Sequence, residues 1–96
     1  MLFIATCLDK PESLDKRLAN RPAHLAYLEG LGDKVRAAGA LLADDLKTPT
    51  GSMLIFSGES EAEIRAILDA DPYAQAGLFA SVTVKPWRQA VGQPLA

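Results

Sequence analysis

The sequence is poor in the residues from which metal centres and disulfide frameworks are built. Its 96 residues include one cysteine, Cys7, and one histidine, His24. A lone cysteine cannot form an internal disulfide, and Cys7 lies in an apolar run that favours a packed thiol over a reactive one. Asp44 and Asp45 are carboxylates outside any cluster with metal-ligand spacing. We therefore expect no disulfide and no metal.

Net charge is small, and long hydrophobic runs are missing. Ten Lys and Arg residues stand against 12 Asp and Glu residues, with the two signs interleaved. This balance gives no electrostatic footprint for nucleic acid or an anionic membrane. No stretch approaches the ~20 apolar residues that span a bilayer, and the apolar N-terminus lacks a positive leader. We expect a cytoplasmic protein without nucleic-acid or membrane partners.

Motifs for nucleotide-dependent and acyl-enzyme chemistry are absent too. The chain has neither a glycine-rich phosphate loop nor the signature of a serine or cysteine nucleophile. Any chemistry would have to come from ordinary side chains, so no cofactor is expected.

Hydrophobic patterning predicts alternating strands and helices. An apolar strand covers Met1 to Leu8, and a short helix is expected from Pro11. Because proline is disfavoured inside a helix, the chain should break at Pro22 and begin a second helix that runs to Ala38 and stops at Gly39. The later elements are predicted as strands at Ala40–Ala43 and Ser52–Ser57, a helix at Ser60–Ala70, a short helical turn at Pro72–Ala76 and a strand at Leu78–Lys85.

This order predicts an α+β fold, a ferredoxin-like βαββαβ protomer whose antiparallel four-stranded sheet carries its helices on one face. The other face has no cover, although both alternating sets of the first strand are apolar. The 49% hydrophobic content is high for so short a chain. We expect a domain at residues 1–88, a tail at 89–96, and a homodimer that packs sheet against sheet.

His24 and Asp71 are the candidate catalytic residues, and each has a plainer alternative. His24 should lie in the first turn of the second helix, where the dipole disfavours a charged ring. It could act as a general base or simply be a packed or capping residue. Asp71 precedes Pro72 and is typical of a helix cap, but a capping carboxylate can also orient an imidazole.

Three further side chains are candidates for binding a substrate. Arg17 and Arg21 bring positive charge towards His24, where they could hold an anionic group or form solvated surface. Tyr73 follows Asp71 closely, and its hydroxyl could line the same pocket or cap the core.

Several segments in this order resemble the YciI-like (YCII-related) family. They are Asp9-Lys10, Ser13-Leu14-Asp15-Lys16-Arg17-Leu18, Arg21-Pro22-Ala23-His24-Leu25, Asp71-Pro72-Tyr73 with Gly77, and Val82-Thr83-Val84-Lys85-Pro86-Trp87. The resemblance covers Met1 to Trp87. It implies a dimeric α+β barrel with an active site built around a histidine and an aspartate, roles that match His24 and Asp71.

Two hypotheses of function follow from these observations. The resemblance includes an enzyme that eliminates chloride from a chlorinated hydroxyquinol without a cofactor. It therefore implies a cofactor-free lyase or isomerase in which His24, oriented by Asp71, moves a proton on a small anionic or phenolic metabolite. The alternative is a non-catalytic dimeric protein that binds a small metabolite in the same cleft.

Overall fold

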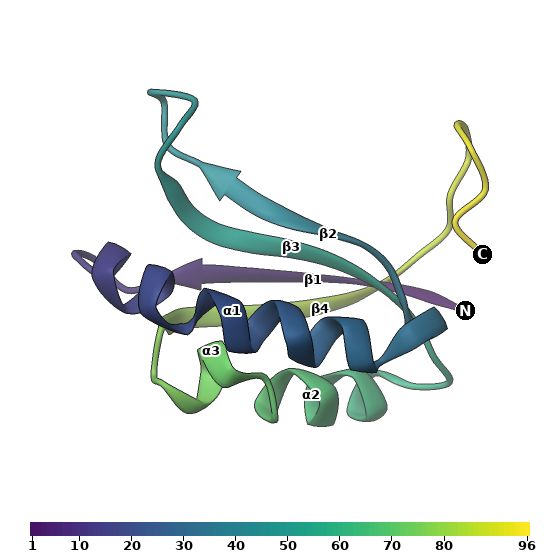
Figure 1. The fold of residues 1–96 in the computed structure, drawn as a ribbon. Coiled ribbons are helices and arrows are strands. Elements are labelled where there is room, and N and C mark those ends of the chain that lie inside the picture. Colours follow the sequence, from purple (N-terminus) through teal and green to yellow (C-terminus); the bar gives the residue numbers. More distant parts are fainter.

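A computed structural model describes all 96 residues as one sheet with helices on one side (Figure 1). Its elements are β1 (Leu2–Asp9), α1 (Leu14–Gly30), a 3-10 turn η1 (Gly32–Lys34), β2 (Val35–Leu42), β3 (Pro49–Ser57), α2 (Glu61–Asp69), α3 (Pro72–Gln75) and β4 (Phe79–Trp87). The strand order is β2-β3-β1-β4, and all neighbours are antiparallel. This is the ferredoxin-like α+β protomer that the sequence predicts.

The hydrophobic core lies between the sheet and the helices. Alternate residues of β1 and β3 face the helices, as the two-residue period of a strand requires. The core cluster consists of Phe3, Ala5, Cys7, Leu28, Leu54, Phe56, Ile64, Leu68 and Val84. Residues one position away in β1 and β3 point to the opposite side of the sheet.

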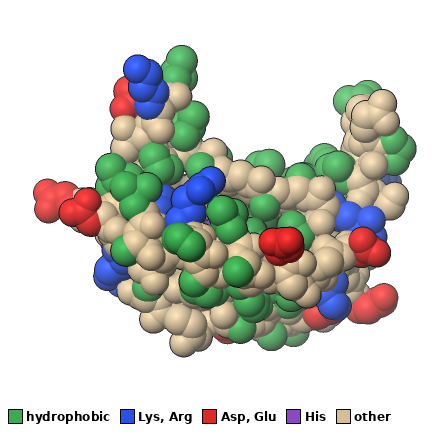
Figure 2. Space-filling view, in the orientation of Figure 1, with side chains coloured by type: hydrophobic (Ala, Val, Ile, Leu, Met, Phe, Trp, Pro, Cys, Tyr) green, Lys and Arg blue, Asp and Glu red, His purple; other side chains and the backbone are tan.

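The opposite side of the sheet carries no helix. Both the tip of the β2–β3 hairpin and the C-terminal tail project on this side (Figure 1), and Figure 2 shows hydrophobic side chains on both. Leu8 and Met53 lie on this face, 47% and 39% exposed. The uncovered apolar face predicted from the sequence is thus present in the single chain.

The first helix differs from its prediction because α1 runs through Pro22 without a break. Pro22 lacks the N–H that would bond the carbonyl of Leu18, a cost of ~3 kcal/mol in a helix interior. Pro22 is exposed, while Arg17, His24 and Leu28 form the buried side of α1. Contacts on the buried side hold both halves of the helix in line, so the predicted break was wrong.

The predicted second helix to Ala38 was also wrong. The helix ends at Gly30, and Gly32 turns the chain with a φ of +59° that favours glycine. Residues 35–42 then form β2, which pairs along its length with β3. An alanine-rich segment becomes an edge strand here because pairing with β3 outweighs its weak helical preference.

The later elements follow the prediction closely. Ser60 caps α2 by accepting a hydrogen bond from the backbone N–H of Glu63 at 3.2 Å. Asp71 caps α3 in the same way, and Pro72 opens that helix. None of the helices has both the length and the apolar character needed to cross a membrane.

Candidate functional site

A buried contact joins the single histidine to the cap of α3. The His24 Nδ1 atom lies 2.8 Å from each carboxylate oxygen of Asp71, with 6% and 1% of the two residues exposed. The carboxylate also accepts the backbone N–H of Tyr73 at 2.9 Å. The Asp71 carboxylate therefore caps α3 and contacts His24 at the same time.

This contact decides which ring nitrogen is free. In the neutral imidazole, the nitrogen that faces a carboxylate carries the proton, so Nδ1–H donates to Asp71 and Nε2 holds the lone pair. Nε2 has no hydrogen-bond partner in the protein, and it is not fully buried. His24 stands in the middle of α1 and not in a first turn, so the helix-dipole argument was wrong.

Tyr73 packs directly against the histidine. The two rings are stacked with centroids 3.9 Å apart, and Phe79 meets Tyr73 edge-on at 6.0 Å. Burial raises the pKa of the Tyr73 hydroxyl, against the opposing charges of Arg17 and Arg21. The ring thus fixes the plane of the imidazole, while its neutral hydroxyl can donate or accept a hydrogen bond.

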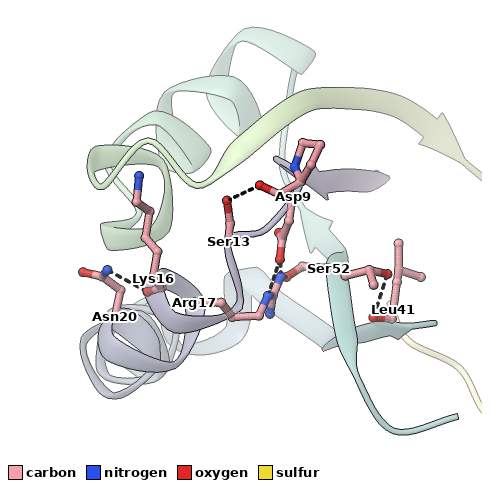
Figure 3. A network of polar contacts seen from close by, with 9 residues as sticks. Asp9, Ser13, Lys16, Arg17, Asn20, Leu41 and Ser52 are labelled. Carbon is pink, nitrogen blue, oxygen red and sulfur yellow. Dashed lines mark hydrogen bonds and ion pairs between the residues drawn. The ribbon is translucent and has the colours of Figure 1, made fainter. Parts of the chain in front are cut away.

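Arg17 reaches from α1 to the sheet and is almost fully enclosed (Figure 3). Its Nε and Nη2 donate to Asp9 at 2.6 and 3.1 Å, and Nη2 also donates to Ser52 Oγ at 2.8 Å. Its Cζ lies 4.8 Å from the centroid of the Tyr73 ring. Burial alone would lower the pKa of Arg17, but the hydrogen bonds and charge of Asp9 raise it. Much of its donor capacity is thus used inside the protein.

Arg21 is placed differently, since it is exposed and makes no ion pair. Arg17, Arg21 and His24 fall at spacings of four and three residues, which a continuous helix puts on one side. The passage of α1 through Pro22 therefore brings the three residues together along one wall.

These residues surround a cavity of about 140 Å³ between α1 and the sheet edge. Its lining is Arg17, Arg21, His24, Leu25, Leu28, Ala38, Gly39, Ala40, Ser52, Leu54 and Tyr73. Four of the five predicted site residues line it, and Asp71 stands behind His24. A larger cavity of about 540 Å³ beside the C-terminal tail contains none of them and no His, Asp or Glu side chain, so it offers no comparable pair of an imidazole and a carboxylate.

Two residues of the site were missed from the sequence, Asp9 and Ser52. Ser52 is the polar member of the helix-facing set of β3, whose other members are Leu54 and Phe56. A hydroxyl in a core-facing register position is the signal that could have drawn attention to it. Asp9, at the end of β1, belongs to a segment that resembles the family and to the predicted helix start, and neither pattern predicts its contact with Arg17.

No group of three or more His, Cys, Asp or Glu residues lies close enough to hold a metal ion. Asp45 instead accepts hydrogen bonds from Thr48 and Lys47 within its own turn. These bonds, led by the Thr48 hydroxyl, lower the pKa of the Asp45 carboxyl.

Fold and site together define a class: a ferredoxin-like α+β domain with a buried His–Asp pair beside a small cavity. The sequence model of the YCII-related domain matches residues 1–88. The chain belongs to the YCII-related family.

Relatives and solved structures agree with this assignment. Protein YciI of Escherichia coli O6:H1 (strain CFT073) is 44% identical, over 93% of this chain and 98% of that protein. An uncharacterized protein of Haemophilus influenzae is 35% identical over the same shares. The structure of 5-chloro-2-hydroxyhydroquinone dehydrochlorinase (TftG) from Burkholderia phenoliruptrix AC1100, in complex with 2,5-dihydroxybenzoquinone, is 40% identical with a TM-score of 0.84, covering 94% of this chain and 96% of that one. An antibiotic biosynthesis monooxygenase, 18% identical with a TM-score of 0.55 over 95% and 100% of the chains, shares the fold.

Proposed function

We propose that this protein is a cofactor-free lyase or isomerase in which His24 is the general base. The observation that carries the proposal is the buried contact of 2.8 Å between His24 Nδ1 and Asp71. It leaves Nε2 as a proton acceptor beside the cavity, and the Asp71 carboxylate stabilises the imidazolium that forms when Nε2 takes up a proton.

The reaction is a proton transfer. Nε2 takes a proton from a carbon or oxygen atom of the substrate, and the electron pair of the broken bond moves to a neighbouring oxygen or expels a leaving group. In an isomerisation the imidazolium returns the proton to another atom of the same molecule. In an elimination the proton and the leaving anion are both released.

The cavity supports a small ring as substrate. A cavity of ~150 Å³ is known to hold benzene, and this one measures about 140 Å³. Leu25, Leu28 and Leu54 give it apolar walls, while Arg21 offers an unpaired positive charge to an anionic group. TftG, at 40% identity, acts on a chlorinated hydroxyhydroquinone, which is a ring of this size and chemistry. Arg17 and Tyr73 complete the proposed binding residues.

The protein is further proposed to work as a homodimer with the two uncovered sheet faces in contact. Exposed Leu8 and Met53 on that face support this arrangement. Light scattering at low micromolar concentration should give twice the mass of the chain. Met53→Asp should convert the dimer into monomers or aggregates, since it places a charge in the contact. A wild-type monomer would contradict the arrangement.

Activity is tested with 5-chloro-2-hydroxyhydroquinone, following chloride release. We expect turnover by the wild type, a loss of about 10²–10⁴-fold in His24→Gln, and little change in Glu29→Gln, which alters an exposed residue of α1. The reaction mixture should contain no added metal or cofactor. Binding of 2,5-dihydroxybenzoquinone without any turnover would favour the non-catalytic binding protein instead.

A further inference from the structure

Ser52 is a buried hydroxyl on the wall of the cavity, and the proposed proton transfer does not yet use it. Only 3% of the residue is exposed, and its side chain lies on the helix-facing side of β3. The preceding residue holds this part of β3 tightly against β1, because a Cβ at Gly51 would lie 2.5 Å from the carbonyl oxygen of Cys7. The position of the hydroxyl is therefore well defined.

The hydrogen bonding of Ser52 is one-sided. Arg17 Nη2 donates to Oγ at 2.8 Å, so the oxygen acts there as an acceptor (Figure 3). A hydroxyl also has one proton to donate, and Ser52 donates to no atom of the protein. Arg17 in turn donates hydrogen bonds to both carboxylate oxygens of Asp9, and these bonds fix the orientation of the guanidinium.

The polar groups at the cavity have unequal roles. His24 Nε2 is the proton acceptor, while Arg21 and the hydroxyls of Tyr73 and Ser52 can donate. The carboxylates of Asp9 and Asp71 are already paired inside the protein, with Arg17 and His24 respectively. A ligand that satisfies this set presents an acidic hydrogen to His24 and an oxygen with available lone pairs to the donors.

We propose that Ser52 is a catalytic residue that donates a hydrogen bond to the substrate oxygen on which negative charge develops. This inference rests on the proposed function and extends it to a second side of the substrate. When Nε2 removes the proton, the electron pair of the broken bond passes through the ring or carbonyl to that oxygen. The Ser52 O–H bond stays intact and only its hydrogen bond shortens, while Arg17 and Asp9 hold the hydroxyl in place.

The substrate class follows from this pairing of donor and base. It is a small enolisable ketone, quinone or phenol whose oxygen is conjugated to the atom that loses the proton. A molecule with an acidic hydrogen but no conjugated oxygen would not use Ser52.

The test compares Ser52→Ala with Ser57→Ala, a matched serine on the same strand outside the cavity lining. For Ser52→Ala we expect kcat for chloride release from 5-chloro-2-hydroxyhydroquinone to fall about 10²–10³-fold with a smaller change in KM. Binding of the 2,5-dihydroxybenzoquinone anion should weaken roughly tenfold or more by calorimetry. Ser57→Ala should match the wild type in both. Because Ser52→Ala also leaves the space of the hydroxyl empty, the pair Ser52→Thr and Ser52→Val, nearly equal in shape, repeats the comparison at constant volume: Thr should keep activity and Val should lose it.

The possible failures are distinguishable. Wild-type kcat and binding in Ser52→Ala, or equal behaviour of the Thr and Val variants, overturns the role of Ser52 while His24→Gln still tests the base. Turnover that survives His24→Gln overturns the proposed function, and the binding measurements then judge Ser52 alone. A wild type that neither binds the quinone nor releases chloride overturns both.

Discussion

Two buried pairs of opposite character lie along one side of α1. Arg17 meets Asp9 through two hydrogen bonds, and His24, seven residues later, meets both oxygens of Asp71. All four side chains are less than 10% exposed. Position, burial and geometry are thus closely similar.

The difference lies in what each base can do with its proton. A guanidinium keeps its charge throughout the accessible pH range, so the Arg17–Asp9 pair is a permanent brace between helix and sheet. An imidazole can take up a proton on one ring nitrogen while the other stays hydrogen-bonded, and the proposed function asks this of the His24–Asp71 pair. Under that proposal, the same buried arrangement serves structure at one place and proton transfer at the other.

The largest effect should come from Asp71→Asn. Asparagine still caps a helix well, so the fold should persist. Its amide would favour a hydrogen bond that leaves Nδ1 unprotonated and puts the proton on Nε2, and kcat should fall about 10²–10⁴-fold. Because the chain has one histidine, ¹⁵N NMR of the untagged protein reports the tautomer directly. An unchanged Nδ1–H tautomer in the variant would argue against this use of Asp71, and Asp69→Asn is the matched control.

Breaking the Arg17–Asp9 pair should lower the free energy of unfolding and leave the tautomer of His24 unchanged. Arg17→Met leaves the Asp9 carboxylate buried without its partner, and urea unfolding should show a loss of ~3–5 kcal/mol. The double variant Asp9→Leu with Arg17→Met should recover much of this loss, because no buried charge is left. A double variant as unstable as the single one would show that packing, and not charge, accounts for the effect.

The carboxylates of both pairs affect the pKa of the Cys7 thiol. Burial, then Asp71 and Asp9, raise its pKa to about 12 from 9.0. A thiol whose folded pKa is raised contributes stability that is fully present below pH 9 and is lost as the pH rises towards 12. Wild type should lose stability over this window faster than Cys7→Ala, by up to ~1.4 kcal/mol per pH unit. Denaturant titrations between pH 8 and 11 check this, and equal slopes would contradict it.

The smallest effect should come from an ion pair outside the core. Arg65 and Glu61 lie one turn apart on α2, 3.0 Å between Nε and Oε2, with about half of each side chain exposed. Water and salt screen such a pair, so Arg65→Gln should cost no more than about 0.3–0.5 kcal/mol in urea unfolding. If Arg65→Gln lowered the free energy of unfolding as much as Arg17→Met, burial would not explain the difference between the two ion pairs.

Local signals predicted the second half of the fold well. The Ser60 cap, the Asp71-Pro72 start of α3 and the continuous apolar run of β3 are all local patterns. The pairing of His24 with Asp71, 47 residues apart, followed from the family resemblance, whereas the distance itself comes from the folded chain.

The first half was harder because tertiary contacts override local preference there. Pro22 suggests a break, yet α1 continues since its buried side is held by Arg17, His24 and Leu28. Residues 35–38 were predicted as the end of a helix, and they join the predicted strand at Ala40–Ala43 in one longer strand only because β3 pairs with them. The link from Asp9 through Arg17 to Ser52 joins three distant segments, and no local pattern announces it.

Pro22 also divides the amide protection of α1. Since Pro22 has no amide proton, one link is missing from the chain of hydrogen bonds that otherwise couples the opening of successive turns. The turn before Pro22 can then unfold locally without unfolding the turn after it. Amide hydrogen exchange should therefore proceed at different rates in the two turns. Arg21 belongs to the turn before Pro22, and His24 belongs to the turn after it. We expect the exposed Arg21 side chain to adjust to an incoming molecule more readily than the imidazole of His24, which Asp71 and Tyr73 hold in place.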